Sequence, residues 1–144
     1  MDALRYRRRH PAARLCHRKG TAIGAQLTID RTNTVLYCER WEETVAFYQS
    51  VLGLTVAFRN DWFVEFHLTS SSFLSIADAA RATVDSVDGE GVTLTWRVPD
   101  LGDVRALLAA GGVEATETQR RWGADVFYCH DPEGHRIEWW SDRM

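Results

Sequence analysis

Two residues that commonly bind metals or move protons lie close together in the middle of the chain. Glu65 and His67 are two positions apart in a segment predicted to be a strand, so their side chains share one face. A carboxylate and an imidazole placed in this way could supply two ligands to a divalent ion. The alternative, which we favour, is that one or both side chains face solvent or the rim of a cleft.

Two further histidines, His130 and His135, flank the sequence Asp-Pro-Glu-Gly at residues 131–134. This four-residue sequence is a strong signal for a tight turn. We therefore expect both imidazoles at the exposed end of a hairpin, as ordinary surface groups.

No activated nucleophile stands out. The serine run at residues 70–72 lacks the Gly-x-Ser-x-Gly surroundings of an esterase serine, and the sequence has no phosphate-binding or dinucleotide-binding glycine motif. The three cysteines, Cys16, Cys38 and Cys129, are far apart and form no Cys-x-x-Cys pair. They predict free thiols in a reducing, cytoplasmic compartment and no zinc site.

The 144 residues suffice for one compact domain, and their net charge of −3 averages two unlike parts. Residues 1–27 hold seven basic groups and one acidic group, whereas residues 28–144 hold ten basic and nineteen acidic groups. We expect the basic arm, 1–27, to be a disordered tail; the alternatives are a transit peptide or a contact with nucleic acid, which we do not favour as a partner. No apolar run reaches the roughly 18 residues of a membrane span, so no membrane partner is expected.

Residues 30–78 show the periodicities of one strand, one helix and three further strands. The helix is predicted from Trp41 to Leu52, because apolar residues recur at spacings of four, three and four, and Gly53 ends it. The strands are predicted at residues 33–38, Leu54–Arg59, Trp62–Leu68 and Phe73–Ala77. The polar segment 79–91 that follows is predicted to be a linker.

The same order of elements recurs in residues 92–141. A strand over Val92–Val98 precedes a helix that begins after Asp100, with Asp103 in a capping-box-like position, and ends at Gly111. The remaining strands are predicted at Val113–Thr118, Ala124–Cys129 and His135–Trp140. The repeat predicts an α+β fold of two βαβββ modules that form an open, cleft-enclosing mixed sheet.

Three stretches of the sequence carry a family resemblance: Asn33-x-x-Leu36, Ala46-Phe47-Tyr48-x-x-Val51-Leu52-Gly53-Leu54, and Asp131-Pro132-Glu133-Gly134-His135-x-Ile137-Glu138. They resemble the vicinal oxygen chelate (VOC) superfamily, which contains glyoxalase I, bleomycin-resistance proteins and extradiol dioxygenases. The resemblance spans about residues 30 to 141 and implies the paired-module fold. It says little about activity, because this fold carries many chemistries.

Metal-using members of this superfamily bind one divalent ion through four strand positions. The resemblance places these positions on Asn33, Ser75, Thr93 and Glu138. Only Glu138 is a good ligand, because amide and hydroxyl oxygens cannot replace imidazole or carboxylate. We therefore expect no metal and no other cofactor, with a divalent metal as the alternative.

The alternation of side chains along the strands predicts which residues face the cleft between the modules. The predicted ligand-binding residues are Asn33, Tyr37, Trp62, Ser75, Thr93, Arg97 and Trp140. Glu138 is the candidate catalytic residue, as a lone general acid–base. The alternatives are core packing for Trp62 and a mutual ion pair between Arg97 and Glu138.

The leading hypothesis is a metal-free protein that binds a small aromatic or cationic molecule in the cleft between its modules, as bleomycin-resistance proteins do. Aromatic walls with a few polar groups are typical of small-molecule pockets, and the acidic residues 28–144 favour a cation. The alternative is a metal-dependent lyase, isomerase or dioxygenase of the same superfamily that uses Glu138 with Glu65 and His67. Exposed sheet edges and the resemblance favour a homodimer, with a monomer left open.

Overall fold

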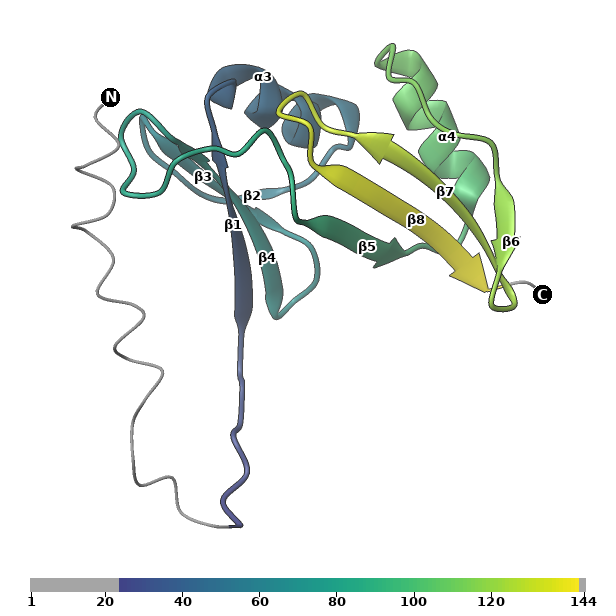
Figure 1. Cartoon of the computed structure of the whole chain (residues 1–144), viewed down its shortest axis with the longest axis horizontal. Helices are drawn as coiled ribbons and strands as arrows, with labels where there is room; N and C mark the ends of the chain where they lie inside the picture. Colours follow the sequence, from purple (N-terminus) through teal and green to yellow (C-terminus); the bar gives the residue numbers. More distant parts are fainter. Residues whose placement is uncertain (1–23, 143–144) are drawn as a thin grey trace.

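The computed structural model describes residues 24–142, which form two modules of the same build (Figure 1). Most of the basic arm, with Cys16, lies outside these residues. The first module consists of β1 (Thr32–Cys38), α3 (Trp41–Ala46), η1 (Phe47–Val51), β2 (Val56–Arg59), β3 (Phe63–His67) and β4 (Ser72–Asp78). The second consists of β5 (Thr93–Arg97), α4 (Leu101–Ala110), β6 (Gln119–Arg121), β7 (Ala124–His130) and β8 (Arg136–Asp142). The predicted α+β fold of two βαβββ modules is confirmed.

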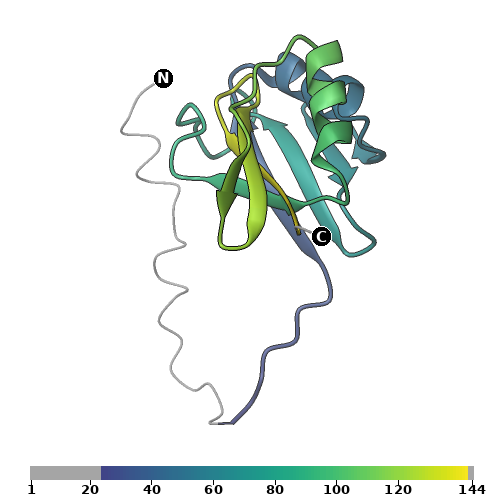
Figure 2. The ribbon, with the colours of Figure 1, turned by 90° about the vertical axis from the view of Figure 1, so that its right-hand side faces the viewer.

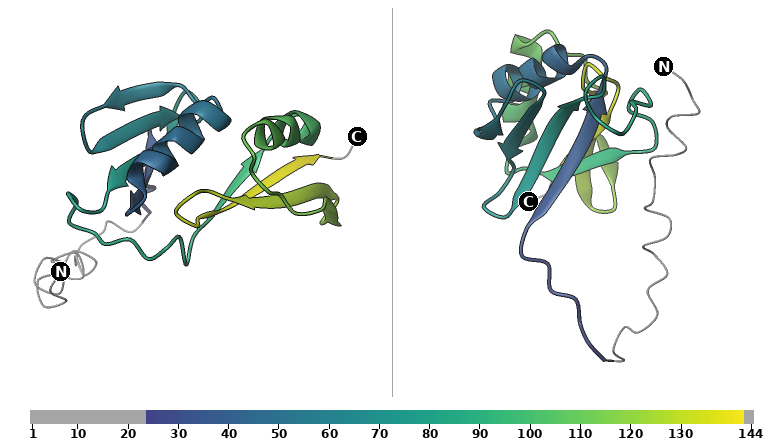
Figure 3. Two further views of the ribbon diagram at one scale, coloured as in Figure 1. Left: turned by 90° about the horizontal axis from the view of Figure 1, so that it is seen from above. Right: turned by 90° about the vertical axis from the view of Figure 1, so that its left-hand side faces the viewer.

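Each module folds into one four-stranded mixed sheet. The strand order is β1-β4-β3-β2 in the first sheet, called sheet one, and β5-β8-β7-β6 in the second, called sheet two. The first strand of each module pairs in parallel with the last strand, and the other pairs are antiparallel. Seen from above, the two modules lie side by side, joined by the linker (Figure 3).

One face of each sheet packs against the helices and contributes to a common core. Leu36, Phe66 and Ile137 on this face are at most 3% exposed, and the most buried residues of β1, β5 and β8 occupy alternate positions, as the strand pattern predicted. Helix α4 lies beside the α3–η1 helix (Figure 2). Tyr48 of η1 meets Trp96 of β5 with ring centroids 6.4 Å apart, so the core crosses the junction between the modules.

The helix predicted over Trp41–Leu52 forms, but its second half is a π-helix. The amide of Leu52 donates to the carbonyl of Phe47, five residues back, at 3.0 Å. At the other end, the Trp41 indole donates to the carbonyl of Ile76 at 2.9 Å, which ties the helix to β4. Among residues 24–142, no helix is long and apolar enough to span a membrane.

The strand predicted at Val113–Thr118 does not form, and β6 lies just after it instead. The amide of Val113 donates to the carbonyl of Leu108 at 2.8 Å, so the chain folds back over the end of α4. Arg105 of α4 then donates to the Thr116 carbonyl and the Thr118 hydroxyl, both at 2.7 Å. These bonds tie the segment to the helix, while the Thr116 amide still donates to the Tyr128 carbonyl of β7 at 2.9 Å, so the segment contacts β7 without forming the predicted strand. At the start of α4, Asp100 accepts from the amide of Gly102 at 2.7 Å, so Asp100 is the N-cap as predicted, although this bond goes to Gly102 and does not include Asp103.

The turn at residues 131–135, called the latch turn below, is not the exposed hairpin end that we predicted. Asp131 and His135 are 4% and 5% exposed. One carboxylate oxygen of Asp131 accepts from the amides of Gly134 and His135 at 2.9 Å. The other accepts from the Tyr48 hydroxyl at 2.7 Å and lies 2.8 Å from His135 Nδ1. The prediction for His135 was wrong because the turn folds against the helix of the other module, whereas His130 is exposed, as predicted.

Glu133 makes the second link between the latch turn and the first module. Its carboxylate accepts from the amides of Glu39 and Arg40 at 2.8 Å and from the Ser86 hydroxyl at 2.9 Å. These amides lie at the N-terminus of α3, where a negative charge is favourable. Glu133 therefore caps a helix that belongs to the other module.

The linker touches the latch turn through glycine backbone. Gly89 has a φ of +76°, and a Cβ atom there would lie 2.2 Å from the carbonyl carbon of Gly134. Gly91 has a similar φ of +81°, but a Cβ atom there would meet nothing within 4 Å. The two glycines thus share a positive φ that would strain an alanine, and they differ in how closely another segment approaches.

The substitution Gly89→Ala is expected to lower the free energy of unfolding by about 3 kcal/mol, and Gly91→Ala by about 1 kcal/mol. Both variants carry the cost of an alanine at positive φ, and only Gly89→Ala adds a backbone clash. Urea unfolding of the two variants measures the difference. Equal losses would show that the linker can move away from the latch turn without cost.

Candidate functional site

Three polar side chains of the first module meet on the face of sheet one that turns away from the helices. Ser75 is fully buried, and its hydroxyl donates to Asn33 Oδ1 at 2.9 Å. Asn33 Nδ2 donates in turn to Glu65 Oε2 at 3.2 Å. The strand order produces this cluster, because β4 lies between β1 and β3 and pairs Ser75 with both Val35 and Glu65. Asn33 and Ser75 were predicted at the site, whereas Glu65 was weighed as a metal ligand and expected, in the favoured alternative, to face solvent or the rim of the cleft.

Arg31 covers this cluster from just outside β1. Its guanidinium pairs with Glu65 and lies over the ring of Phe73, 3.7 Å from the ring centre. His67 lies against the same ring, with centroids 4.9 Å apart. Neither Arg31 nor Phe73 was predicted as a site residue. The available signal was spacing, because each stands two positions before a predicted site residue on its own strand face.

The other two predicted residues of the first module lie farther along sheet one. Tyr37 is half-buried and pairs with Ala77. Trp62 is half-buried before β3, edge-to-face with Phe63 at 5.5 Å between centroids, and it is not part of the common core. Trp62 therefore does not pack in the common core. Neither ring is hydrogen-bonded to the cluster of Asn33, Glu65 and Ser75.

The corresponding face of sheet two carries Glu138. The hydroxyl of Thr95 donates to Glu138 Oε1 at 3.2 Å across the parallel pair β5–β8. Thr93 accepts from Arg136 Nε at 3.0 Å, which occupies its hydroxyl oxygen. Glu138 is therefore oriented by a neighbour on the same sheet.

The ion pair considered between Arg97 and Glu138 does not form. Arg97 Nη1 lies 3.2 Å from Asp142 Oδ2, and its guanidinium carbon is 5.7 Å from the centre of the Trp140 ring. The register does not by itself select the partner, because Arg97 pairs with Trp140 in β8, two residues beyond Glu138 and two before Asp142. The positive charge of Arg97 is thus partly balanced, and the Glu138 carboxylate has no cationic partner among the described residues.

A pocket of about 330 Å³ opens beside Glu138. It is lined by Thr95, Arg121, Trp122, Ala124, Val126, Glu138 and Trp140. Trp122 stands at the tip of the β6–β7 hairpin with a φ of +50°, and it is 89% exposed. Trp122 was not predicted as a site residue. The signal available in the sequence was a large aromatic residue followed by a glycine, between two short strands. An exposed indole beside a carboxylate suits the recognition of a ligand.

The polar faces of the two sheets are not joined within one chain. No residue of the first module lines the pocket at Glu138. Within residues 24–142, no hydrogen bond links Asn33 or Ser75 to Thr93 or Glu138. The structure brings Asn33 to Ser75, and Glu138 to Trp140, but it does not bring the four family positions together.

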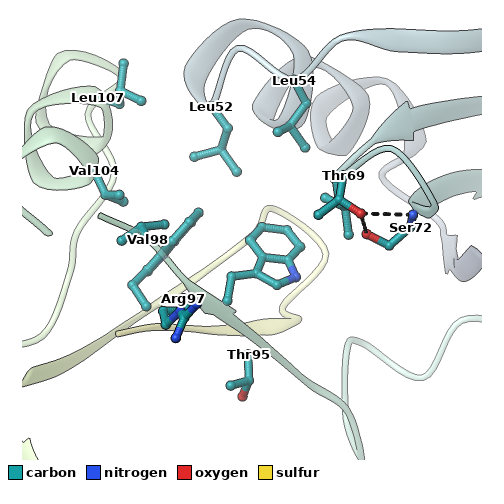
Figure 4. A pocket seen from close by; sticks show the side chains of 12 residues that line it. Leu52, Leu54, Thr69, Ser72, Thr95, Arg97, Val98, Val104 and Leu107 are labelled. Atoms are coloured by element: carbon teal, nitrogen blue, oxygen red, sulfur yellow. Dashed lines mark hydrogen bonds between the residues drawn. The ribbon is translucent and has the colours of Figure 1, made fainter. Parts of the chain in front are cut away.

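A larger pocket, of about 540 Å³, lies where the two modules meet (Figure 4). Its lining is mainly apolar: Leu52, Leu54, Leu68, Thr69, Ser72, Thr95, Trp96, Arg97, Val98, Val104, Leu107 and Trp139. Of the predicted site residues it contains only Arg97. The apolar residues on β5, α4 and β8 were assigned to helix–sheet packing, because periodicity shows that a residue faces a helix and not whether the space beside it is filled.

The donor atoms at the four family positions do not suit a divalent transition metal. Asn33 and Ser75 are hydrogen-bonded to each other, and Thr93 is hydrogen-bonded to Arg136. Of the four, Glu138 alone offers a carboxylate. Across residues 24–142, no three His, Cys, Asp or Glu side chains are arranged to hold a metal ion. Glu65 is paired with Arg31 on sheet one, away from Glu138 on sheet two. No step of chemistry is assigned to a metal.

The two described cysteines, Cys38 and Cys129, are free and buried. Burial raises the pKa of both thiols, and the charge of Asp131 raises it further. A thiol with a raised pKa keeps its proton and is a poor nucleophile. Neither cysteine is therefore a catalytic candidate.

Known proteins share this fold. A sequence profile of the glyoxalase-like domain family matches residues 26–139. A glyoxalase/bleomycin resistance protein/dioxygenase from Nocardioides is 21% identical, with a TM-score of 0.67 over 83% of this chain and 86% of that chain. Lactoylglutathione lyase from Agrobacterium tumefaciens is 17% identical, with a TM-score of 0.64 over 81% and 96%. TnmS3, an antibiotic-binding protein from Streptomyces sp. CB03234, is 15% identical, with a TM-score of 0.69 over 83% and 100%. No curated protein matches the sequence significantly.

Proposed function

The chain belongs to the glyoxalase-like domain family, within the VOC superfamily, and from this premise we propose that it is a binding protein for a small aromatic or cationic molecule. The ligand binds in the pocket at Glu138, and no metal takes part. The observation that carries the proposal is that one carboxylate and two exposed or half-exposed indoles, Trp122 and Trp140, line the same pocket.

The chemistry of this pocket favours an aromatic cation. A cation over an indole face gains about 0.5 to 2 kcal/mol, and the Glu138 carboxylate adds attraction for the same charge. Of the nearby guanidinium groups, Arg97 is paired with the Asp142 carboxylate. Arg121 donates to the neutral side chain of Gln119 and keeps its charge, so the carboxylate and the two indoles are what favour a cation here. The likeness to the antibiotic-binding protein TnmS3 supports a ligand-binding role for the fold.

We propose further that the chain is a homodimer, in which the polar face of sheet one in one copy meets the face of sheet two in the other. One chain leaves these two faces apart, and both sheets end in strands with a free edge, β1 and β2 in sheet one and β5 and β6 in sheet two. A cytoplasmic location is part of the proposal, in line with the free thiols.

The proposal is tested with proflavine, an aromatic cation, and 2-naphthalenesulfonate, an aromatic anion. Quenching of tryptophan fluorescence is expected to show binding of proflavine, weakened about tenfold in Glu138→Gln and at least as much in Trp140→Ala. Glu117→Gln is the matched control, because Glu117 is exposed and outside the pocket. Equal affinity of wild type and Glu138→Gln for proflavine, or stronger binding of the anion, would contradict the proposal.

The absence of a metal has its own test. Ni²⁺, Zn²⁺, Fe²⁺ and Mg²⁺ are each expected to change the melting temperature of the wild type by less than about 2 °C, because a bound metal would stabilise the native state by mass action. A large rise that disappears in Glu138→Ala would favour the metal-dependent lyase, isomerase or dioxygenase in its place.

A further inference from the structure

The carboxylate and the aromatic ring that contact Arg31 are held in place by other residues. The Glu65 side chain is 15% exposed, and its carboxylate is held by Asn33, which is held in turn by the buried hydroxyl of Ser75. The Phe73 ring is 7% exposed. These residues stand on three adjacent strands, β1, β4 and β3, so the position of the carboxylate and of the ring is fixed without Arg31.

Two attractions meet at the guanidinium of Arg31. The Glu65 carboxylate attracts any cation, whereas the face of Phe73, 3.7 Å from the guanidinium carbon, favours a cation that can lie flat over it. Together they select a planar cation over a compact ammonium group. The bond from Asn33 leaves one oxygen of Glu65 turned toward that cation.

Arg31 is held through its side chain, by Glu65 and by the ring of Phe73. It lies in the segment before β1, which has no regular structure, and 49% of its side chain is exposed. Its departure would open no part of the common core, which contains neither Arg31 nor Phe73. The site can therefore exchange Arg31 for an external group.

We infer that this face of sheet one is a binding site for a guanidinium or amidinium group, and that Arg31 is its intramolecular placeholder. Within one chain the site lies on sheet one and the Glu138 pocket on sheet two. In the proposed homodimer, where these two faces meet, the site must stay open to an external cation for the inference to hold. An external cation competes with Arg31, so its apparent affinity is reduced by the fraction of time that the site is free.

Benzamidine and its neutral isostere benzamide, titrated into the full chain and followed by ¹H–¹⁵N NMR, test the site. Arg31→Ala is expected to bind benzamidine about tenfold more tightly than the wild type, which corresponds to an Arg31 occupancy of about 90%. The shifts should centre on the Asn33 side-chain amide and the Phe73 backbone amide. Benzamide is expected to bind neither protein.

Matched variants distinguish binding at this site from the general effect of breaking an exposed ion pair. Arg81 pairs with Asp61 at 2.6 Å on the exposed surface, and no aromatic ring of residues 24–142 lies beneath it. Arg81→Ala is therefore expected to leave benzamidine affinity unchanged. In the Arg31→Ala background, Glu65→Gln should abolish the gain and Glu138→Gln should preserve it. Equal benzamidine affinity of wild type and Arg31→Ala, equal binding of benzamide, or loss of the gain in Glu138→Gln would overturn the inference.

Discussion

Replacing Asp131 by alanine is expected to lower the free energy of unfolding by about 4 kcal/mol, a large share of the stability of a domain of this size. The Asp131 side chain is fully buried and accepts from two backbone amides and the Tyr48 hydroxyl, with His135 beside it. Without the carboxylate, these donors stay buried and lose their acceptor. The melting temperature should fall by about 15 °C.

Urea unfolding followed by tryptophan fluorescence measures this loss. Asp85→Ala is the matched control, since Asp85 is exposed, and it should stay within about 0.5 kcal/mol of the wild type. A loss below about 1 kcal/mol in Asp131→Ala would show that water or a rearranged turn replaces the carboxylate.

Tyr48→Phe tells whether the loss arises at the contact between the modules. Burial and the Asp131 charge hold the pKa of Tyr48 well above its usual 10.0, so its hydroxyl keeps the proton that it donates to Asp131. We expect Tyr48→Phe to cost about 1.5 kcal/mol in the wild type and close to nothing in Asp131→Ala. Additive losses would place the effect of Asp131 within its own turn.

The substitution Glu133→Ala is expected to cost about 3 kcal/mol. Glu133 is 6% exposed, and its carboxylate accepts from the amides of Glu39 and Arg40 and from Ser86, so its removal uncaps α3 and frees the middle of the linker. Bonds from neutral donors to a charged acceptor contribute about 1.5 to 3 kcal/mol each before relaxation. The expected loss of about 3 kcal/mol is smaller than their sum, because water is expected to replace some of these hydrogen bonds in the variant.

Hydrogen exchange locates the effect of Glu133. In Glu133→Ala, the amides of Glu39 and Arg40 should exchange at least tenfold faster than the change in global stability alone requires. Glu117→Ala, at an exposed glutamate, should alter neither stability nor exchange by a measurable amount. Unchanged exchange at these two amides would mean that the helix is capped by another group.

Much of the fold could be predicted because strand and helix periodicity is local. The alternation along β5 and β8 identified Leu94 and Ile137 as buried residues before any tertiary contact was known. The strand predicted at Val113–Thr118 does not form, for an equally physical reason. Arg105 of α4 donates to acceptors of this segment, and local strand propensity contains no information about a donor on a distant helix.

The candidate site was predictable only in part. The alternation of side chains along the strands predicted that Asn33, Ser75, Glu138 and Trp140 point away from the helices. It did not predict that these residues lie on two separate sheets. Arg97 pairs with Trp140, which is two residues from both Glu138 and Asp142, so strand register alone could not show that Asp142 is its partner. Trp122 escaped notice because a hairpin tip carries no periodicity that says where its side chain points.

By itself, the sequence determined two βαβββ modules, their family resemblance and the side of each strand that meets a helix, because these depend on residues a few positions apart. Only the tertiary structure decided that the Asp-Pro-Glu-Gly turn joins the modules through Tyr48 and α3, and that Arg31 lies between Glu65 and Phe73. Those contacts join segments more than thirty residues apart. Their geometry is set when the sheets and helices pack, and no local pattern encodes it.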